Sequence, residues 1–152
     1  MSALVTKSEK LTQKVYEKLK TLINSGNLTA FTNALNETAT TDIKTALATS
    51  FDKNGCTLIH WAGGSSSSTI LQYLLQTHTT ISPNILAVKQ SLDRTPLHYA
   101  ARNGSVECAR ILIEEFGGEV DWRCKGGVTP FQVRARRSEE RGGERRQAAV
   151  VK

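Results

Sequence analysis

The side chains best suited to chemistry are those of three histidines and three cysteines, and their spacing decides what they could do. His60 and His98 lie in similar surroundings, T-L-I-H-W-A and T-P-L-H-Y-A. Imidazole is a common zinc ligand, so the pair could indicate a metal site. Because both occupy the same position of a repeated pattern, we instead expect each to hydrogen-bond backbone or threonine groups.

The cysteines Cys56, Cys108 and Cys124 are scattered and form no C-x-x-C pair. Such spacing is typical of a reducing compartment and argues against a disulfide framework or a zinc ribbon. No cysteine, serine or histidine falls in a recognisable nucleophile motif. The sequence therefore predicts no catalytic residue, no metal and no cofactor.

A glycine- and serine-rich run at Gly63–Ser68 could suggest a phosphate-binding loop. It lacks the G-K-[ST] ending of such loops, and it follows a predicted helix rather than a strand. We interpret the run as a flexible turn after a frayed helix.

Residues 134–152 are rich in arginine and carry most of the net charge of +6. Arginine clusters are typical of nuclear-import or nucleic-acid-binding segments. Here glutamates are interleaved with the arginines, and no aromatic residue is available to stack on bases. We predict a basic, disordered tail at 134–152. Binding of nucleic acid or an anionic surface by this tail stays open as the alternative function.

The best-defined local pattern is T-P-L-H-Y-A-A-R-N-G, which begins at Thr95. Thr95 can cap a helix, and Pro96 suits the first helical position. Leu97 and Ala100 share one face of that helix, and Gly104 can supply the left-handed residue that ends it. The pattern predicts a short helix that needs a partner to cover its apolar face.

A second helix is expected to follow, with one apolar stripe made of Val106, Ala109, Leu112, Ile113 and Phe116. Such a helix pair cannot bury its apolar surface alone, so copies of the unit are expected on either side.

Degenerate copies of the pattern lie at Thr57–Ala62 and Thr129–Phe131, the latter keeping Pro130. With Thr95–Ala100, they resemble the T-P-L-H-x-A motif of the ankyrin repeat family. The resemblance implies an all-α solenoid of stacked helix–turn–helix pairs, with loop or hairpin fingers projecting from one edge and degenerate terminal repeats. It also implies a non-catalytic protein–protein interaction module. The predicted domain covers residues 1–133, with units at about 8–38, 52–76, 90–117 and 121–137.

Aligning the copies places equivalent residues on the finger and inner-helix face that ankyrin repeats use for binding. None of these positions is acidic and about half are Lys or Arg, whereas Glu107, Glu114 and Glu115 of the central repeat fall on its outer helix. We therefore predict a protein partner with an acidic segment. Trp122 could either contact this partner or pack on the neighbouring finger. The predicted partner-binding residues are Phe51, Lys53, Leu92, Arg94, Arg102, Trp122, Arg123 and Lys125.

No apolar run is long enough to span a bilayer, and the N-terminal residues lack the apolar core of a signal peptide. We therefore expect a monomeric intracellular protein, cytoplasmic or nuclear, without a membrane span.

Overall fold

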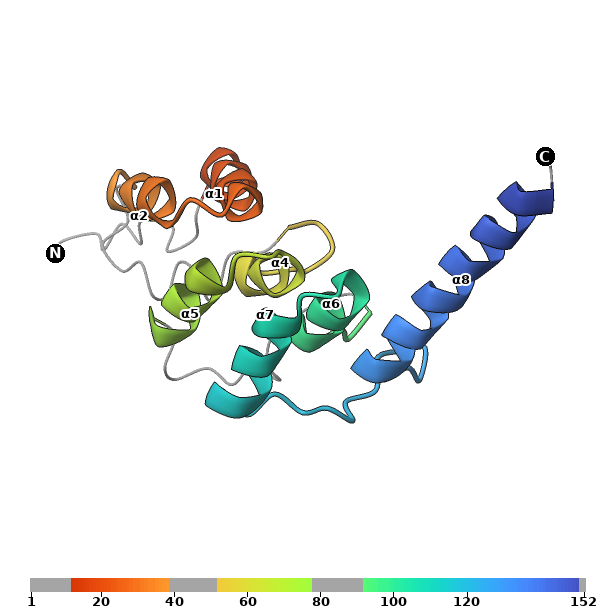
Figure 1. Ribbon diagram of the computed structural model, residues 1–152. Helices are drawn as coiled ribbons and strands as arrows, with labels where there is room; N and C mark the ends of the chain where they lie inside the picture. Colours follow the sequence, from red (N-terminus) through yellow and green to blue (C-terminus); the bar gives the residue numbers. More distant parts are fainter. Residues whose placement is uncertain (1–11, 39–51, 78–91, 151–152) are drawn as a thin grey trace, which may run out of the picture.

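The computed structural model describes residues 12–38, 52–77 and 92–150, with side chains up to residue 141. Within these ranges the regular elements are all helical. Six of these helices form three pairs, each made of an inner and an outer helix that stack side by side (Figure 1). The pairs are α1 (Gln13–Ser25) with α2 (Leu28–Asn36), α4 (Leu58–Gly64) with α5 (Ser68–Thr77), and α6 (Pro96–Asn103) with α7 (Val106–Arg110). The predicted all-α stack of helix pairs is confirmed.

The predicted caps explain where the inner helices begin and end. Thr57 and Thr95 precede α4 and α6 as N-cap residues, and Pro96 occupies the first turn of α6. Gly26 ends α1 and Gly104 ends α6, with φ angles of 71° and 72°. These left-handed conformations favour glycine, which has no Cβ to clash with the backbone.

One apolar core runs through the stack from pair to pair. Its members include Leu19 and Phe31 in the first pair, Leu74 in the second and Leu112 in the third, each 0% exposed. Tyr16, which the sequence analysis did not include, is also buried, and its hydroxyl donates a hydrogen bond to the Cys56 carbonyl oxygen. This bond joins the first pair to the loop that precedes the second.

The glycine- and serine-rich run packs between repeats instead of forming the flexible turn that we predicted. A Cβ on Gly63 would lie 2.9 Å from the Pro96 carbonyl oxygen, so glycine allows α4 and α6 to approach closely. The Asn103 amide donates a 2.7 Å hydrogen bond to the Gly64 carbonyl oxygen, and the Ser67 hydroxyl donates one of 2.7 Å to that of Ile23. The run therefore contacts the repeats on both sides.

The outer helix of the third pair differs from the predicted stripe. It continues from α7 into a π-helical turn, η2 (Ile111–Glu115), which rotates its residues relative to a regular α-helix. Cys108, Ile111 and Leu112 are buried, whereas Val106 is 76% and Ile113 39% exposed. The prediction was right for Leu112 and wrong for Val106 and Ile113.

The last repeat contains one long helix, α8 (Pro130–Val150), that packs on α6 and projects from the end of the stack (Figure 1). The segment predicted as a disordered tail is therefore helical up to residue 150. Its Ala, Arg, Glu and Gln residues have high helix propensity, and no proline follows Pro130 to interrupt it. The domain boundary placed at 133/134 falls inside this helix and stays a prediction.

Candidate functional site

The repeat histidines hold the loops that precede the inner helices. The Thr57 backbone N–H donates a 3.1 Å hydrogen bond to His60 Nδ1. His60 Nδ1 is therefore the acceptor, and Nε2, 3.0 Å from the Arg94 carbonyl oxygen, carries the hydrogen and donates it. His60 thus caps its own helix and also fixes the loop of the next repeat.

His98 repeats this arrangement one unit further along. Its Nδ1 accepts from the Thr95 N–H at 3.1 Å, and its Nε2 lies 3.0 Å from the Val128 carbonyl oxygen. The predicted hydrogen-bonding role of both histidines is confirmed. No group of three or more His, Cys, Asp or Glu side chains that could hold a metal occurs among the described residues.

Burial keeps both imidazoles neutral. It lowers the pKa of His60 from 6.5 to about 4, against the hydrogen bond to Arg94, which raises it. Burial also lowers the pKa of His98. Nδ1 can accept a hydrogen bond only when the ring is neutral. Because both rings are neutral at neutral pH, their hydrogen bonds hold the loops there.

In the last repeat Gln132 takes the place of the histidine. The Thr129 N–H donates to Gln132 Oε1 at 3.0 Å, so the cap of α8 is kept without an imidazole. The glutamine amide thus accepts the capping hydrogen bond that histidine Nδ1 accepts in the other repeats, and it has no titratable group.

Three loops, which we call fingers, precede the inner helices: the α4 finger (residues 52–56), the α6 finger (92–94) and the α8 finger (119–128). The α6 and α8 fingers are joined by a 3.0 Å hydrogen bond from the Lys125 N–H to the Leu92 carbonyl oxygen. The α6 and α8 helices leave these fingers side by side. Residues of both fingers and both helices line the space between them.

This space is a groove of about 480 Å³. Its lining combines four arginines with apolar side chains, and Glu140 is the one acid among the described residues that line it. The groove therefore has a positive potential. The lining residues are Leu92, Arg94, Arg102, Cys124, Gly126, Val128, Val133, Arg136, Arg137 and Glu140.

Arginine side chains also hold α8 against the end of α6. Arg137 Nη1 donates hydrogen bonds of 2.8 Å to the Arg102 carbonyl oxygen and to Asn103 Oδ1. The Arg134 guanidinium lies against Gly104, where a Cβ would be only 2.6 Å from Arg134 Nη1. The helix wall of the groove is therefore fixed at the level of the last turn of α6.

Three acids of the central repeat, Glu107, Glu114 and Glu115, lie on its outer helix, as the sequence predicted, whereas Asp93 lies in the α6 finger. Arg110 forms ion pairs with Glu107, Glu114 and Glu115 at 2.7, 2.9 and 3.4 Å on the outer helix. Arg110 offsets one of these three negative charges, and negative charge is absent from the described lining of the groove except at Glu140.

Three of the predicted partner-binding residues, Leu92, Arg94 and Arg102, line this groove. The Leu92 side chain is 44% exposed, which is high for a large apolar residue. Arg94 precedes α6 and Arg102 lies in its last turn. The repeat alignment therefore selected residues from opposite ends of α6 that line the same groove.

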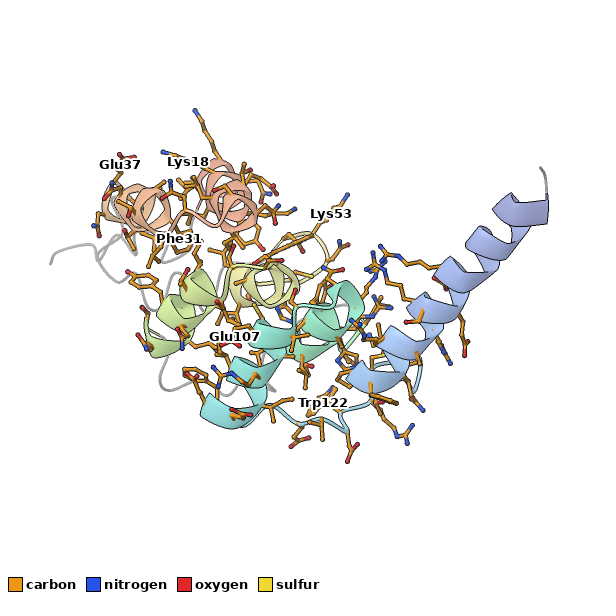
Figure 2. The ribbon with its side chains drawn as sticks, in the orientation of Figure 1. Lys18, Phe31, Glu37, Lys53, Glu107 and Trp122 are labelled. Carbon is orange, nitrogen blue, oxygen red and sulfur yellow. The ribbon has the colours of Figure 1, made fainter. Side chains whose placement is uncertain are left out.

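The remaining predicted residues lie around the groove or away from it. Trp122 Nε1 donates a 3.0 Å hydrogen bond to the Asp93 carbonyl oxygen, so this side chain packs on the neighbouring finger (Figure 2). Arg123 and Lys125 are exposed on the α8 finger. Lys53 projects from the α4 finger and does not line the groove (Figure 2). Phe51 lies outside the described residues.

The predicted site did not include Val133, Arg136, Arg137 and Glu140 of α8. Their spacing of i, i+3, i+4 and i+7 places them on one helix face. This signal was present in the sequence, but a segment predicted to be disordered has no defined face on which to place it.

Paired helices that stack through short capped turns, with fingers bonded from repeat to repeat, define a helical repeat protein. The family model for ankyrin repeats (3 copies) matches residues 10–120 and 82–140. The chain belongs to the ankyrin repeat family, whose repeats mediate protein binding and are generally non-catalytic.

Individual proteins are similar over different lengths. The chain is 35% identical over 94 residues to alpha-latrotoxins of Latrodectus hesperus and Latrodectus hasselti. This match covers 62% of the chain and only 6% of each toxin. In the crystal structure of the yeast ribosomal protein Rps3 in complex with its chaperone Yar1, the Yar1 fold is similar with a TM-score of 0.69 and 19% identity. That similarity covers 86% of this chain and 89% of the other. Among the described residues, no helix combines the length and apolar character needed to cross a membrane.

Proposed function

We propose that this protein is a non-catalytic interaction module that binds an acidic segment of another protein on its finger and inner-helix face. The observation that carries the proposal is the groove, which four arginines and one glutamate line together with apolar side chains. Guanidinium groups form strong paired hydrogen bonds with carboxylates, so the lining suits an acidic ligand.

The proposed site extends from the groove onto the α8 finger. Arg94 and Arg102 inside the groove, with Arg123 and Lys125 beside it, would contact the partner's carboxylates. Such charges mainly raise the rate of association and make it sensitive to salt. Leu92 supplies exposed apolar surface, whose burial slows dissociation.

The similarity to Yar1 supports the proposal at the level of shape. Yar1 is the chaperone of a ribosomal protein, so a stack of similar length and arrangement does bind another protein. At 19% identity the similarity supports a shared fold only. The proposal that the partner is acidic is based on the residues that line the groove.

The test begins with a pull-down by the full chain and identification of what is retained. The affinity of that partner is then measured for the wild type, for the double variant Arg102→Glu with Arg123→Glu, and for Lys14→Glu as a control. Lys14 is exposed on α1, away from the groove. We expect the double variant to lose most of its affinity at low salt and the control to keep it. Unchanged affinity in a normally folded double variant would place the site elsewhere.

Binding of nucleic acid through the arginine-rich segment is the alternative. Deleting residues 142–152 tests it, because this removes the end of the basic segment and leaves every described residue that lines the groove. We expect the protein partner to be retained by this truncated chain. A loss of binding to an RNA or DNA oligonucleotide, with no protein partner found, would favour the alternative.

A further inference from the structure

The lining of the groove changes character along its length. The α6 and α8 fingers are bonded to each other, and Arg137 of α8 is bonded to the last turn of α6. Both helices therefore run from the finger end in the same direction. Position along either helix then gives position along the groove.

At the finger end most of the lining is apolar, and at the far end most of it is charged. The finger end holds Leu92, Cys124, Val128 and the first-turn residue Val133, with Arg94 among them. The far end holds Arg102, Arg136, Arg137 and Glu140.

The distance between the two zones is short. Val133 and Arg137 are four residues apart on α8, which is about 6 Å at the rise of an α-helix. An extended peptide covers about 6 to 7 Å in two residues. A volume of about 480 Å³ also lies within the range of pockets that bind ligands. A short extended segment could thus contact both zones at once.

We propose that the groove selects the order of side chains in its partner: an apolar side chain next to Leu92, Val128 and Val133, with a carboxylate two residues away facing Arg102 and Arg137. This inference rests on the proposed function and deepens it. It specifies a protein segment, because a nucleic acid backbone offers phosphates without an apolar side chain at that spacing. A second copy of the chain is disfavoured, since two copies at +6 repel each other.

Three short fluorescein-labelled peptides provide the test. The first has one leucine in the middle and a glutamate two residues away on each side, with serine and glycine elsewhere. The second has the same composition, but its leucine is moved to one end, at least five residues from either glutamate. The third has serine in place of the leucine. Fluorescence anisotropy gives the affinity of each for the full chain.

We expect the first peptide to bind about tenfold more tightly than the other two, because burial of its leucine side chain contributes enough free energy for a gain of that size. Leu92→Ser should reduce the affinity for the first peptide to that for the other two. The affinities for those two peptides should not change. Arg102→Glu should weaken all three, and Lys14→Glu should weaken none. Leu92 and Arg102 are both exposed, so these variants should keep the fold.

The possible failures are distinguishable. If the first two peptides bind equally and Arg102→Glu weakens both, the order of side chains is not selected, but an acidic partner is still supported. If no peptide binds, or if Arg102→Glu changes nothing, both the inference and the proposed site are wrong.

Discussion

Replacing His60 by glutamine should reduce the loss of stability that the protein shows in acid. The His60 pKa is about 4 in the folded state and 6.5 when exposed, because burial disfavours the charged ring. Between these pH values the unfolded state binds more protons than the folded state. The contribution of His60 to stability is therefore complete above pH 6.5 and is lost as the pH falls through about 4.

The size of this effect follows from the two pKa values. One pH unit corresponds to about 1.4 kcal/mol, so His60 alone should cost on the order of 3 kcal/mol of stability below pH 4. A stack of four repeats has little stability in reserve, so a change of this size should be visible as acid unfolding.

Glutamine is the matched replacement because Gln132 occupies this position in the last repeat and still accepts from the Thr129 N–H. His60→Gln should keep the cap of α4 and lose the bond to the Arg94 carbonyl oxygen. We expect a cost of about 1 to 3 kcal/mol at pH 7. The assay is urea unfolding followed by circular dichroism at several pH values between neutral and 4.

The wild type should lose clearly more stability than His60→Gln over this pH range, so that the two free energies of unfolding converge in acid. If the free energies of unfolding of the two proteins ran parallel over this pH range, protonation of His60 would not be coupled to unfolding. His98→Gln gives a second test, since burial also lowers the pKa of His98. It should flatten the pH dependence in the same direction.

Three further predictions concern packing and the wall of the groove. Leu112→Ala should cost about 2 to 5 kcal/mol in urea unfolding, whereas Val106→Ala, 76% exposed on the same outer helix, should change little; equal effects would refute the observed helix face. Gly63→Ala should destabilise by about 1 to 3 kcal/mol because its Cβ would overlap the backbone of α6, and Gly126→Ala, whose Cβ would meet only ordinary van der Waals contacts at 3.8 and 3.9 Å, should be tolerated. Arg137→Ala should speed amide hydrogen exchange in the part of α8 beside α6, and unchanged exchange would show that this side chain does not hold the helix.

The repeat architecture could be predicted from the sequence because its strongest signals are local. A threonine cap, a proline in the first turn and Gly104 after the last turn each act within a few residues of their own position. Leu92, Arg94 and Arg102 could be placed on one face because equivalent positions of a repeat occupy equivalent places in the stack, and all three line the groove. The same reasoning predicted the shared hydrogen-bonding role of His60 and His98.

The features that were missed depend on contacts between distant residues. The face that the outer helix of the third pair turns to the core is set by packing, which buries Cys108, Ile111 and Leu112 and leaves Val106 and Ile113 exposed. No local pattern marks the π-helical turn at Ile111–Glu115. The packing of Gly63 against α6 turns an apparently flexible run into a close contact. The helix at the C-terminal end was missed because its charged residues bury little surface. Without α8, neither Arg137 nor Glu140 could be assigned to the groove.

The most direct test of the proposed function is to map where the partner binds. Backbone amide NMR spectra of the full chain, recorded with and without the partner isolated in the pull-down, report which residues it contacts. We predict that the largest chemical-shift changes fall on the α6 and α8 fingers, on Arg102 and on residues 133–140. Changes concentrated on the outer helices α2, α5 and α7, or on residues beyond 141, would contradict the proposed site.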